Sequence, residues 1–392
     1  MLYISAGDTS TLFFPEGYHF YKLLLRDPEQ ISVFFEKGTD ISANLLANPR
    51  HLGYFADEGN FIVIKITALL CFLGFGKYMV VNLFFALIAF SGIWKLFNFF
   101  LDQYPKLGRE MAIALLFLPT LTFWSSGILK DSLSIASLGW FTYSAYQLLY
   151  HKRNILLNLT ILFISIYLFS VVKIYILVAY LPAFFVFLIL KNTMLLKSTF
   201  SKVFFILTFI AISIAGFTYV TGTMTTAISK YAGEDIVEGI SGYQANYAYQ
   251  GENQDGSYFS LGVEFDPKSP NLLKIAPAAI VATLFRPFIW ESRSVSTLLT
   301  SLESFSLMLF TIYVLFKIGL LKFIKLIFKY PIILYSLTFS LIFALFIGAT
   351  TLNFGSLVRY KIPCIPFYLI SLFLLLYHQK TDIAALKKTG AQ

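Results

Sequence analysis

The stretch ILLNLTILFISIYLFSVVKIYILVAYLPAFFVFLIL at residues 155–190 decides the fold class. Its only charged residue is Lys173, which divides an otherwise apolar run. A transmembrane helix needs about 20 mostly apolar residues, so this run is long enough for two helices. We predict them at Ile155–Val172 and Ile174–Leu190. The apolar residues do not alternate with polar ones, which argues against the strands of a membrane β-barrel.

The composition of the whole chain agrees with this interpretation. Of its 392 residues, 57% are hydrophobic and 13% are charged, whereas a soluble domain has about 25% charged residues. A soluble globular protein is therefore excluded. Comparable runs predict seven further spans, at Tyr78–Leu101, Met111–Trp124, Ser132–Tyr150, Val203–Val220, Leu298–Phe316, Pro331–Ala349 and Leu357–Tyr377. We expect an all-α polytopic membrane protein, a bundle of about nine to ten transmembrane helices with extracytoplasmic loops that carry juxtamembrane helices.

The basic residues predict the orientation of the chain. The net charge is +9, but the lysines and arginines lie at the ends of the apolar runs rather than in one patch, so no nucleic-acid partner is predicted. Cytoplasmic loops are enriched in basic residues. Five connecting segments, including the tail after Tyr377, hold 14 of them. The acidic stretches 1–59 and 221–272 then face outward. The C-terminus is expected to be cytoplasmic.

This orientation divides the chain into five segments. They are an extracytoplasmic loop (1–59), a first membrane bundle (60–220), an outward loop (221–297), a second bundle (298–378) and a cytoplasmic tail (379–392). An outward loop at 1–59 requires a preceding span, so we expect a first helix before Met1. The alternative is a crossing at Phe61–Phe75, but Lys65 in the middle of that run favours an interfacial helix. The stretch Leu272–Trp290 is predicted to be re-entrant or on the surface, because it contains two prolines and Arg286.

Ionisable residues near the outward ends of the spans suggest a site, because charges at membrane depth are costly and usually functional. Together, cations and an acid suit the transfer of a sugar from a lipid phosphate. The cations hold the phosphate, and a carboxylate takes a proton from the attacking hydroxyl. The candidate catalytic residues are Asp8 and Asp131. The candidate phosphate-binding residues are Lys130, Lys173, Arg286, Arg293 and Arg359.

Each of these residues also has a simpler interpretation. Lys173, Arg293 and the nearby Lys361 could extend to lipid headgroups, and Asp131 could cap the helix that follows it. Lys130 and Asp131 are adjacent and therefore cannot share a helix face. The hypothesis of a catalytic site therefore depends on these residues lying together on the outward side of the membrane, and not on any single residue.

The loop 221–272 is rich in tyrosine and amide residues. Aromatic rings stack on sugars and amides bind their hydroxyl groups, which makes Tyr243, Tyr247 and Tyr249 candidate sugar-binding residues. The alternative is an aromatic belt at the membrane interface.

The four histidines are scattered and form no metal cluster, although a divalent metal at the site stays open. Motifs of hydrolases, zinc proteases and ATPases are absent from the sequence.

Three features of the layout resemble a known family. Gly7 and Asp8 come where an outward loop would begin, the stretches Tyr18–Leu25 and Ile31–Glu36 have the character of juxtamembrane helices, and FIVIKITALLCFLGFGKY ends in a glycine turn. This order resembles the type C glycosyltransferases, which use polyprenyl-phosphate-linked sugars on the outer side of the membrane, and the related O-antigen and exopolysaccharide polymerases. The resemblance implies that Asp8 is the catalytic base, that Asp131 is a second acid, and that Arg286 or Arg359 contacts the lipid phosphate.

The resemblance also implies the partners, a polyprenyl-phosphate-linked hexose or pentose and a lipid-linked or cell-surface glycan acceptor. Within enzymes, the alternative is a glycan polymerase. In a different class, a flippase for lipid-linked oligosaccharides would also use cations. A flippase needs them along a path through the membrane, however, and the inner halves of the predicted spans are almost free of charge. A glycosyltransferase is therefore favoured over a flippase.

Overall fold

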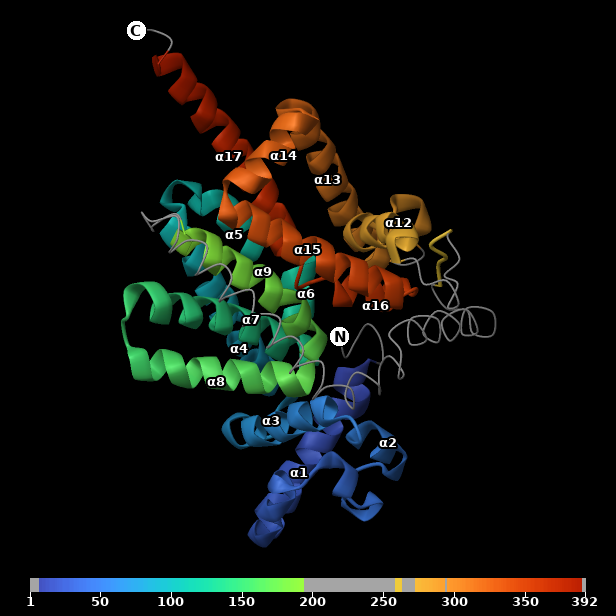
Figure 1. Ribbon diagram of the computed structural model, residues 1–392. Coiled ribbons are helices and arrows are strands. Elements are labelled where there is room, and N and C mark those ends of the chain that lie inside the picture. Colours follow the sequence, from blue (N-terminus) through green and yellow to red (C-terminus); the bar gives the residue numbers. More distant parts are fainter. Residues whose placement is uncertain (1–6, 194–257, 263–271, 293–294, 390–392) are drawn as a thin grey trace. The chain divides into compact units, whose positions relative to one another are not determined.

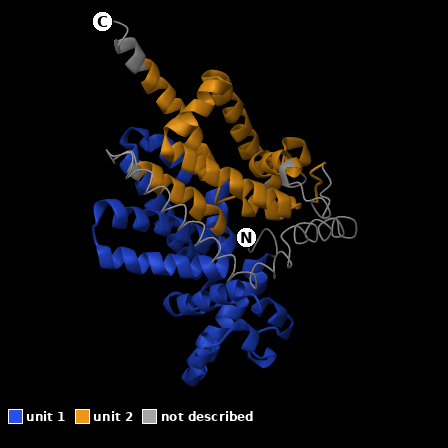
Figure 2. Cartoon of the chain, in the orientation of Figure 1, with its two compact units in different colours: residues 1–177 blue, residues 178–392 orange. Residues whose placement is uncertain are grey.

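The computed structural model describes residues 7–193, 258–262, 272–292 and 295–389. Helices make up 85% of the structure, and no β-strand occurs in the described residues apart from an isolated bridge between Tyr258 and Asn353 (Figure 1). The chain divides into two compact units, residues 1–177 and 178–392 (Figure 2). The boundary falls within the first predicted bundle, 60–220.

Unit 1 contains the acidic head and the first membrane helices. Its helices are α1 (Phe14–Arg26), α2 (Leu52–Phe55), α3 (Glu58–Gly74), α4 (Tyr78–Gln103), α5 (Gly108–Leu115), α6 (Pro119–Ser125), α7 (Lys130–Tyr146) and α8 (Ile155–Val172). Helix α9 (Ile174–Thr193) begins in unit 1 and continues into unit 2. The described helices of unit 2 that follow are α12 (Leu272–Phe285), α13 (Val295–Ile318), α14 (Leu320–Lys329), α15 (Pro331–Thr350), α16 (Phe354–Tyr360) and α17 (Ile365–Thr389).

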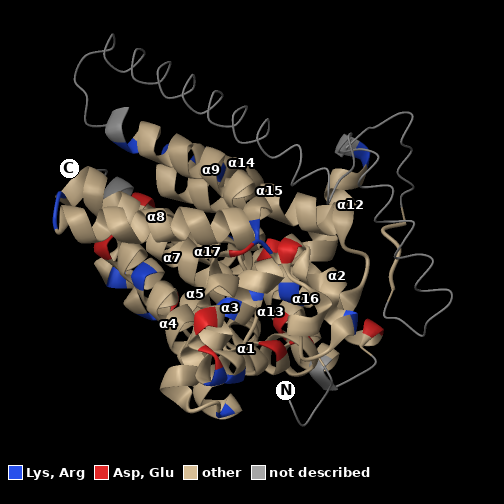
Figure 3. Cartoon of the chain, turned by 90° about the horizontal axis from the view of Figure 1, so that it is seen from below, with Lys and Arg blue, Asp and Glu red and all other residues tan. Residues whose placement is uncertain are grey.

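The described residues contain five helices long and apolar enough to span a membrane, or up to seven if each of two bent pairs counts as one span. The five are α4, α8, α9, α13 and α15. The multi-pass helical character is thus supported, whereas the count of nine to ten is not confirmed. The run Val203–Val220 lies outside the described residues. Charged residues are sparse along the helices (Figure 3).

Two spans that we predicted as single helices are broken. The run Met111–Trp124 is divided between α5 and α6, which are bent by 61°. Pro119 opens α6, and a residue before proline avoids the helical conformation, so Leu118 is extended. The run Leu357–Tyr377 is divided between α16 and α17, bent by 58°. Prolines at positions 363 and 366 explain that break, because proline cannot continue the helical hydrogen bonds.

Helix α7 differs from the predicted span Ser132–Tyr150. It has 17 residues and nearly all are buried, including several serines. Its closest approach is to α4, where a Cβ atom on Gly139 would lie 1.8 Å from the carbonyl oxygen of Gly92. Small residues allow the backbones of membrane helices to pack this closely. Helix α7 is therefore a core helix of unit 1, and α8 covers it on another side.

The acidic head forms helices beside α3. The predicted juxtamembrane helix Tyr18–Leu25 lies within α1, and Ile31–Glu36 largely coincides with a 3-10 helix at Pro28–Phe35. Helix α3 covers most of the predicted interfacial run Phe61–Phe75 and packs against α1. The Lys65 Nζ atom donates a hydrogen bond to the carbonyl oxygen of Glu36, at 3.0 Å. Lys65 therefore joins the head to α3.

Candidate functional site

The loop between α6 and α7, residues 126–129, and the first turn of α7 are where separate segments of unit 1 meet. The Asn82 side chain on α4 donates to the carbonyl oxygen of Ser126 at 3.0 Å. The Thr9 hydroxyl donates to the carbonyl oxygen of Ile128 at 3.1 Å. Thr9 is next to Asp8, so this hydrogen bond brings the Asp8 segment to the same end of the unit as the first turn of α7.

Asp131 and Lys173 form a buried ion pair. Asp131 lies in the first turn of α7, and Lys173 lies at the junction of α8 and α9. The Lys173 Nζ atom donates to the Asp131 carboxylate, and the two side chains are 6% and 4% exposed. A buried charge is costly unless it is paired. Lys173 is thus no headgroup anchor, and the N-cap position of α7 belongs to Leu129 rather than Asp131.

The adjacent Lys130 pairs in another direction, with Asp57. The Lys130 Nζ atom lies 2.7 Å from the Asp57 carboxylate, and the side chains are 14% and 29% exposed. Asp57 is also the N-cap of α3, because its carboxylate accepts from the backbone N–H of Gly59 at 2.8 Å. Our sequence analysis missed Asp57. An acidic residue directly before an apolar helical run is a usual N-cap signal and could have identified it.

Asp8 is an exposed carboxylate at this end of unit 1. It directly precedes a short π-helix at Thr9–Phe13, which continues into α1. Asp8 is exposed to solvent, whereas the neighbouring Thr9 is buried. This end of unit 1 therefore combines two ion pairs with a third carboxylate that is exposed to solvent.

The head contains a further buried acid that we did not predict. Glu16 on α1 is fully buried and accepts hydrogen bonds from the backbone N–H groups of Ala47 and Asn48, at 2.9 and 3.1 Å. It also lies 2.6 Å from the His51 ring. Three partners on one carboxylate hold the segment 47–51 against α1, so Glu16 stabilises the acidic head.

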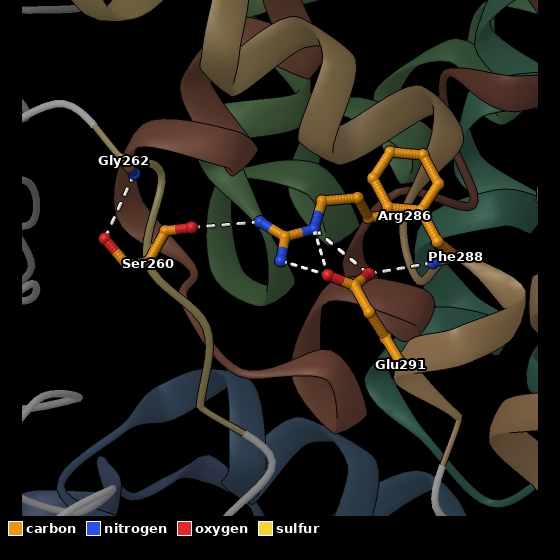
Figure 4. Close-up of polar contacts among 5 residues, drawn as sticks. All are labelled: Ser260, Gly262, Arg286, Phe288 and Glu291. Carbon is orange, nitrogen blue, oxygen red and sulfur yellow. Dashed lines mark hydrogen bonds and ion pairs between the residues drawn. The ribbon is translucent and has the colours of Figure 1, made fainter.

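In unit 2, Arg286 contacts a carboxylate and a backbone carbonyl group (Figure 4), and aromatic rings lie close to it. Its Nε atom lies 3.0 and 3.1 Å from the two carboxylate oxygens of Glu291, and Nη2 also donates to Glu291. Nη1 donates to the carbonyl oxygen of Ser260 at 3.0 Å. The guanidinium lies 4.3 Å from the ring centre of Phe259, within cation–π distance. The predicted phosphate-binding Arg286 is thus already paired with an acid.

Lys361 is buried beside the same arginine. Its Nζ atom donates to the carbonyl oxygen of Arg286 at 2.9 Å and to the Ser304 hydroxyl at 2.8 Å. Lys361 is 1% exposed, so extension to headgroups is wrong for it. Arg359 lies in the last turn of α16 and is half-buried.

The remaining predicted site residues cannot be placed. Arg293, Tyr243, Tyr247 and Tyr249 lie outside the described residues. In the part of the chain that is described, no group of three or more histidine, cysteine, aspartate or glutamate side chains could hold a metal ion. The structure thus brings together Lys130, Asp131, Lys173 and the Asp8 segment in unit 1. It places Arg286 close to Lys361 in unit 2.

Comparison with known proteins finds no relative for this chain. No family model, no curated protein and no solved structure matches it. Any statement of function therefore depends on the residues and their geometry.

Proposed function

We propose that the protein is a membrane glycosyltransferase. It would move a hexose or pentose from a polyprenyl-phosphate donor to a lipid-linked or cell-surface glycan acceptor, on the outer face of a bacterial inner membrane. The observation that supports this most is the grouping at residues 126–131, where an exposed carboxylate segment and two ion pairs meet at one end of the unit 1 helices. The resemblance to type C glycosyltransferases agrees with this position for Asp8.

The proposed reaction exchanges one glycosidic bond for another. The acceptor hydroxyl attacks the anomeric carbon of the sugar, and the bond from that carbon to the phosphate oxygen breaks. Asp8 takes the proton of the hydroxyl as general base. The leaving polyprenyl phosphate gains negative charge, which a fixed cation stabilises.

The ion pairs divide the charged residues into two roles. Lys130 and Lys173 neutralise Asp57 and Asp131, so we assign both lysines to positioning of the first turn of α7 rather than to direct phosphate binding. Arg286 is held by Glu291. Arg359 is half-buried in the last turn of α16, and its role as a lipid-phosphate contact stays an expectation from the resemblance.

The test is a transfer assay on the full chain in phospholipid vesicles. The donors are polyprenyl phosphates that carry radiolabelled hexoses or pentoses, and the acceptors are lipid-linked glycans. We expect Asp8→Asn to reduce transfer by about 100-fold or more, because general bases contribute 10²–10⁴-fold. Asp40→Asn is the matched control, since Asp40 is an exposed acid of the same head.

The alternatives give other results. Full activity of Asp8→Asn would remove Asp8 from the mechanism. Products that grow by repeated units would identify a polymerase. Movement of the lipid-linked sugar between leaflets without a new glycosidic bond would contradict an enzyme and indicate a flippase.

A further inference from the structure

Helix α14 is short and presents three different faces. It connects α13 to α15, both of which are candidate membrane spans (Figure 1). Gly319 precedes it with a φ of 77°, a backbone conformation that suits glycine and lets the chain turn sharply out of α13. Pro331 then starts α15. Helix α14 therefore lies at the end of two spans, at the depth where a bilayer has its headgroups.

The first face is held by the protein. Leu326 is 2% exposed, and α14 packs against α15 and α17. At its C-terminal end, the Tyr330 ring stacks on His378 at 3.5 Å, and the Lys329 Nζ atom lies 2.9 Å from the Asp382 carboxylate. The hydrogen bond with Asp382 raises the pKa of Lys329 above its ordinary value. These contacts fix the rotation of α14 about its own axis.

The second face is apolar and exposed. Leu320, Leu321, Ile324 and Phe328 are 66%, 86%, 45% and 70% exposed. Residues four apart lie on one side of a helix, so Leu320, Ile324 and Phe328 form a continuous strip with Leu321 beside it.

The third face is basic and borders the apolar strip. Lys322, Lys325 and Lys329 are spaced three and four residues apart and so share a side of the helix. At about 100° per residue, this basic side falls between the apolar strip and the face that packs on the protein. Lys329 pairs with Asp382 on α17, and α14 itself contains no acidic residue.

We propose that α14 is a binding site for anionic phospholipid, with its apolar strip in the acyl-chain boundary and with Lys322 and Lys325 on the phosphate groups. An interfacial helix has this combination of a large apolar side and a lysine-rich side, and basic residues next to a membrane attract anionic lipids. The charge complementarity favours an anionic lipid over an apolar protein partner. The site is independent of the proposed glycosyltransferase activity.

The first test measures depth. A fluorescent dye is attached to a cysteine at Ile324→Cys or, separately, at Lys322→Cys in the full chain, reconstituted in mixed vesicles of phosphatidylcholine and phosphatidylglycerol. Nitroxides on the acyl chains should quench the dye at position 324, and nitroxides on the headgroups should quench the dye at position 322. If aqueous iodide alone quenched the dyes at both positions, the proposal would be overturned. It would also be overturned if the dye at position 324 were protected from iodide only at a high density of protein in the vesicles, since another copy of the chain would then cover α14.

The second test measures the preference for charge. Spin-labelled phosphatidylglycerol should quench the dye at position 324 more than spin-labelled phosphatidylcholine at the same mole fraction. Each basic residue near an anionic surface contributes about 1 kcal/mol, or about fivefold. Removal of two in Lys322→Gln with Lys325→Gln should therefore lower the preference by about 25-fold. This pair of substitutions leaves the Lys329–Asp382 contact intact.

The matched control removes two other lysines. Lys106 and Lys152 are exposed, and the predicted orientation places them on the same side of the membrane as α14. Lys106→Gln with Lys152→Gln should leave the preference unchanged. Equal quenching by the two lipids in the unmodified chain, or an equal loss in both double variants, would contradict a specific site on α14.

Discussion

The ion pairs of unit 1 join segments that are far apart in the sequence, whereas Arg286 in unit 2 pairs with a glutamate five residues ahead. Lys173 and Asp131 are 42 residues apart, and Lys130 and Asp57 are 73 residues apart. Pairs of the first kind fasten separate helices to one another. A pair of the second kind stabilises a single turn, here the turn at residues 286–291 that follows α12. Ion pairs thus serve long-range assembly in unit 1, whereas the pair at Arg286 serves local shape.

The two pairs of unit 1 also differ from each other in burial. Lys173 and Asp131 are almost completely buried, whereas Asp57 is partly exposed. Removal of one partner from a buried pair leaves an uncompensated charge and is far more costly than the loss of an exposed pair. We therefore expect a graded series of effects from substitutions at these sites.

The largest effect is expected at the buried pair. Asp131→Ala should lower the free energy of unfolding by about 3–5 kcal/mol, because the Lys173 ammonium is left buried without its carboxylate. The measurement is denaturant unfolding in detergent micelles. As a control, the double variant Asp131→Leu with Lys173→Met removes both charges and should recover most of the loss. A single variant as stable as the parent would show that the pair does not hold α7 to the start of α9.

A smaller and more local effect is expected at Arg286. Arg286→Lys keeps the charge but loses the two-pronged contact with Glu291 and the stacking on Phe259. Hydrogen bonds to charged groups contribute about 1.5–3 kcal/mol, and we expect a loss of that size. Hydrogen exchange should increase around residues 286–291 and hardly elsewhere. Arg109→Lys, on an exposed position of α5, is the control. Increased exchange throughout unit 2 would argue against a local role.

Two substitutions at Asp57 distinguish the contribution of its ion pair to stability from the contribution of its helix cap. Asp57→Asn keeps an N-cap side chain and loses the pair with Lys130, so the loss should be about 1 kcal/mol or less. Asp57→Ala loses both contacts and should cost about 1 kcal/mol more. The two variants are compared by thermal unfolding. Equal losses would mean that the cap contributes nothing at this position.

The smallest effect on stability is expected at Asp8. An exposed carboxylate outside a helix interior contributes little, and substitutions at such positions usually change stability by less than about 0.5 kcal/mol. Asp8→Asn and Asp40→Asn should therefore unfold alike while they differ in the transfer assay. A marked loss of stability in Asp8→Asn would make its effect on activity a consequence of misfolding.

The sequence predicted the long apolar helices well. The division of residues 155–190 at Lys173 is confirmed, and the bounds of α8 agree with the prediction. Length and hydropathy decide such helices almost alone. The breaks in two other spans were missed, although Pro119 and the prolines at 363 and 366 signal them, because an apolar run looks continuous when only its hydropathy is considered.

The site was predicted less completely than the helices. The sequence identified Lys130, Asp131 and Lys173 and showed that adjacent residues of a helix must face different ways. It did not show which segment each would meet, because this choice depends on the packing of α7 against α4 and α8. Glu291 and Asp57 were missed as partners for the same reason. The observed excess of cations over acids among the candidate residues is therefore smaller than the sequence predicted, because Lys130, Lys173 and Arg286 each pair with an acid.

The orientation of unit 1 is the claim on which the proposed function depends most directly. Lys77 precedes α4 at the end that carries the ion pairs, Lys152 follows α7 at the other end, and both side chains are exposed. Each lysine is replaced by cysteine in turn and treated in intact cells with a maleimide that cannot cross the membrane, with the parent chain and its two buried cysteines as the blank. We predict that Lys77→Cys is labelled at once and that Lys152→Cys is labelled only after the cells are permeabilised. The reverse pattern would place the carboxylates on the cytoplasmic side and contradict transfer on the outer face.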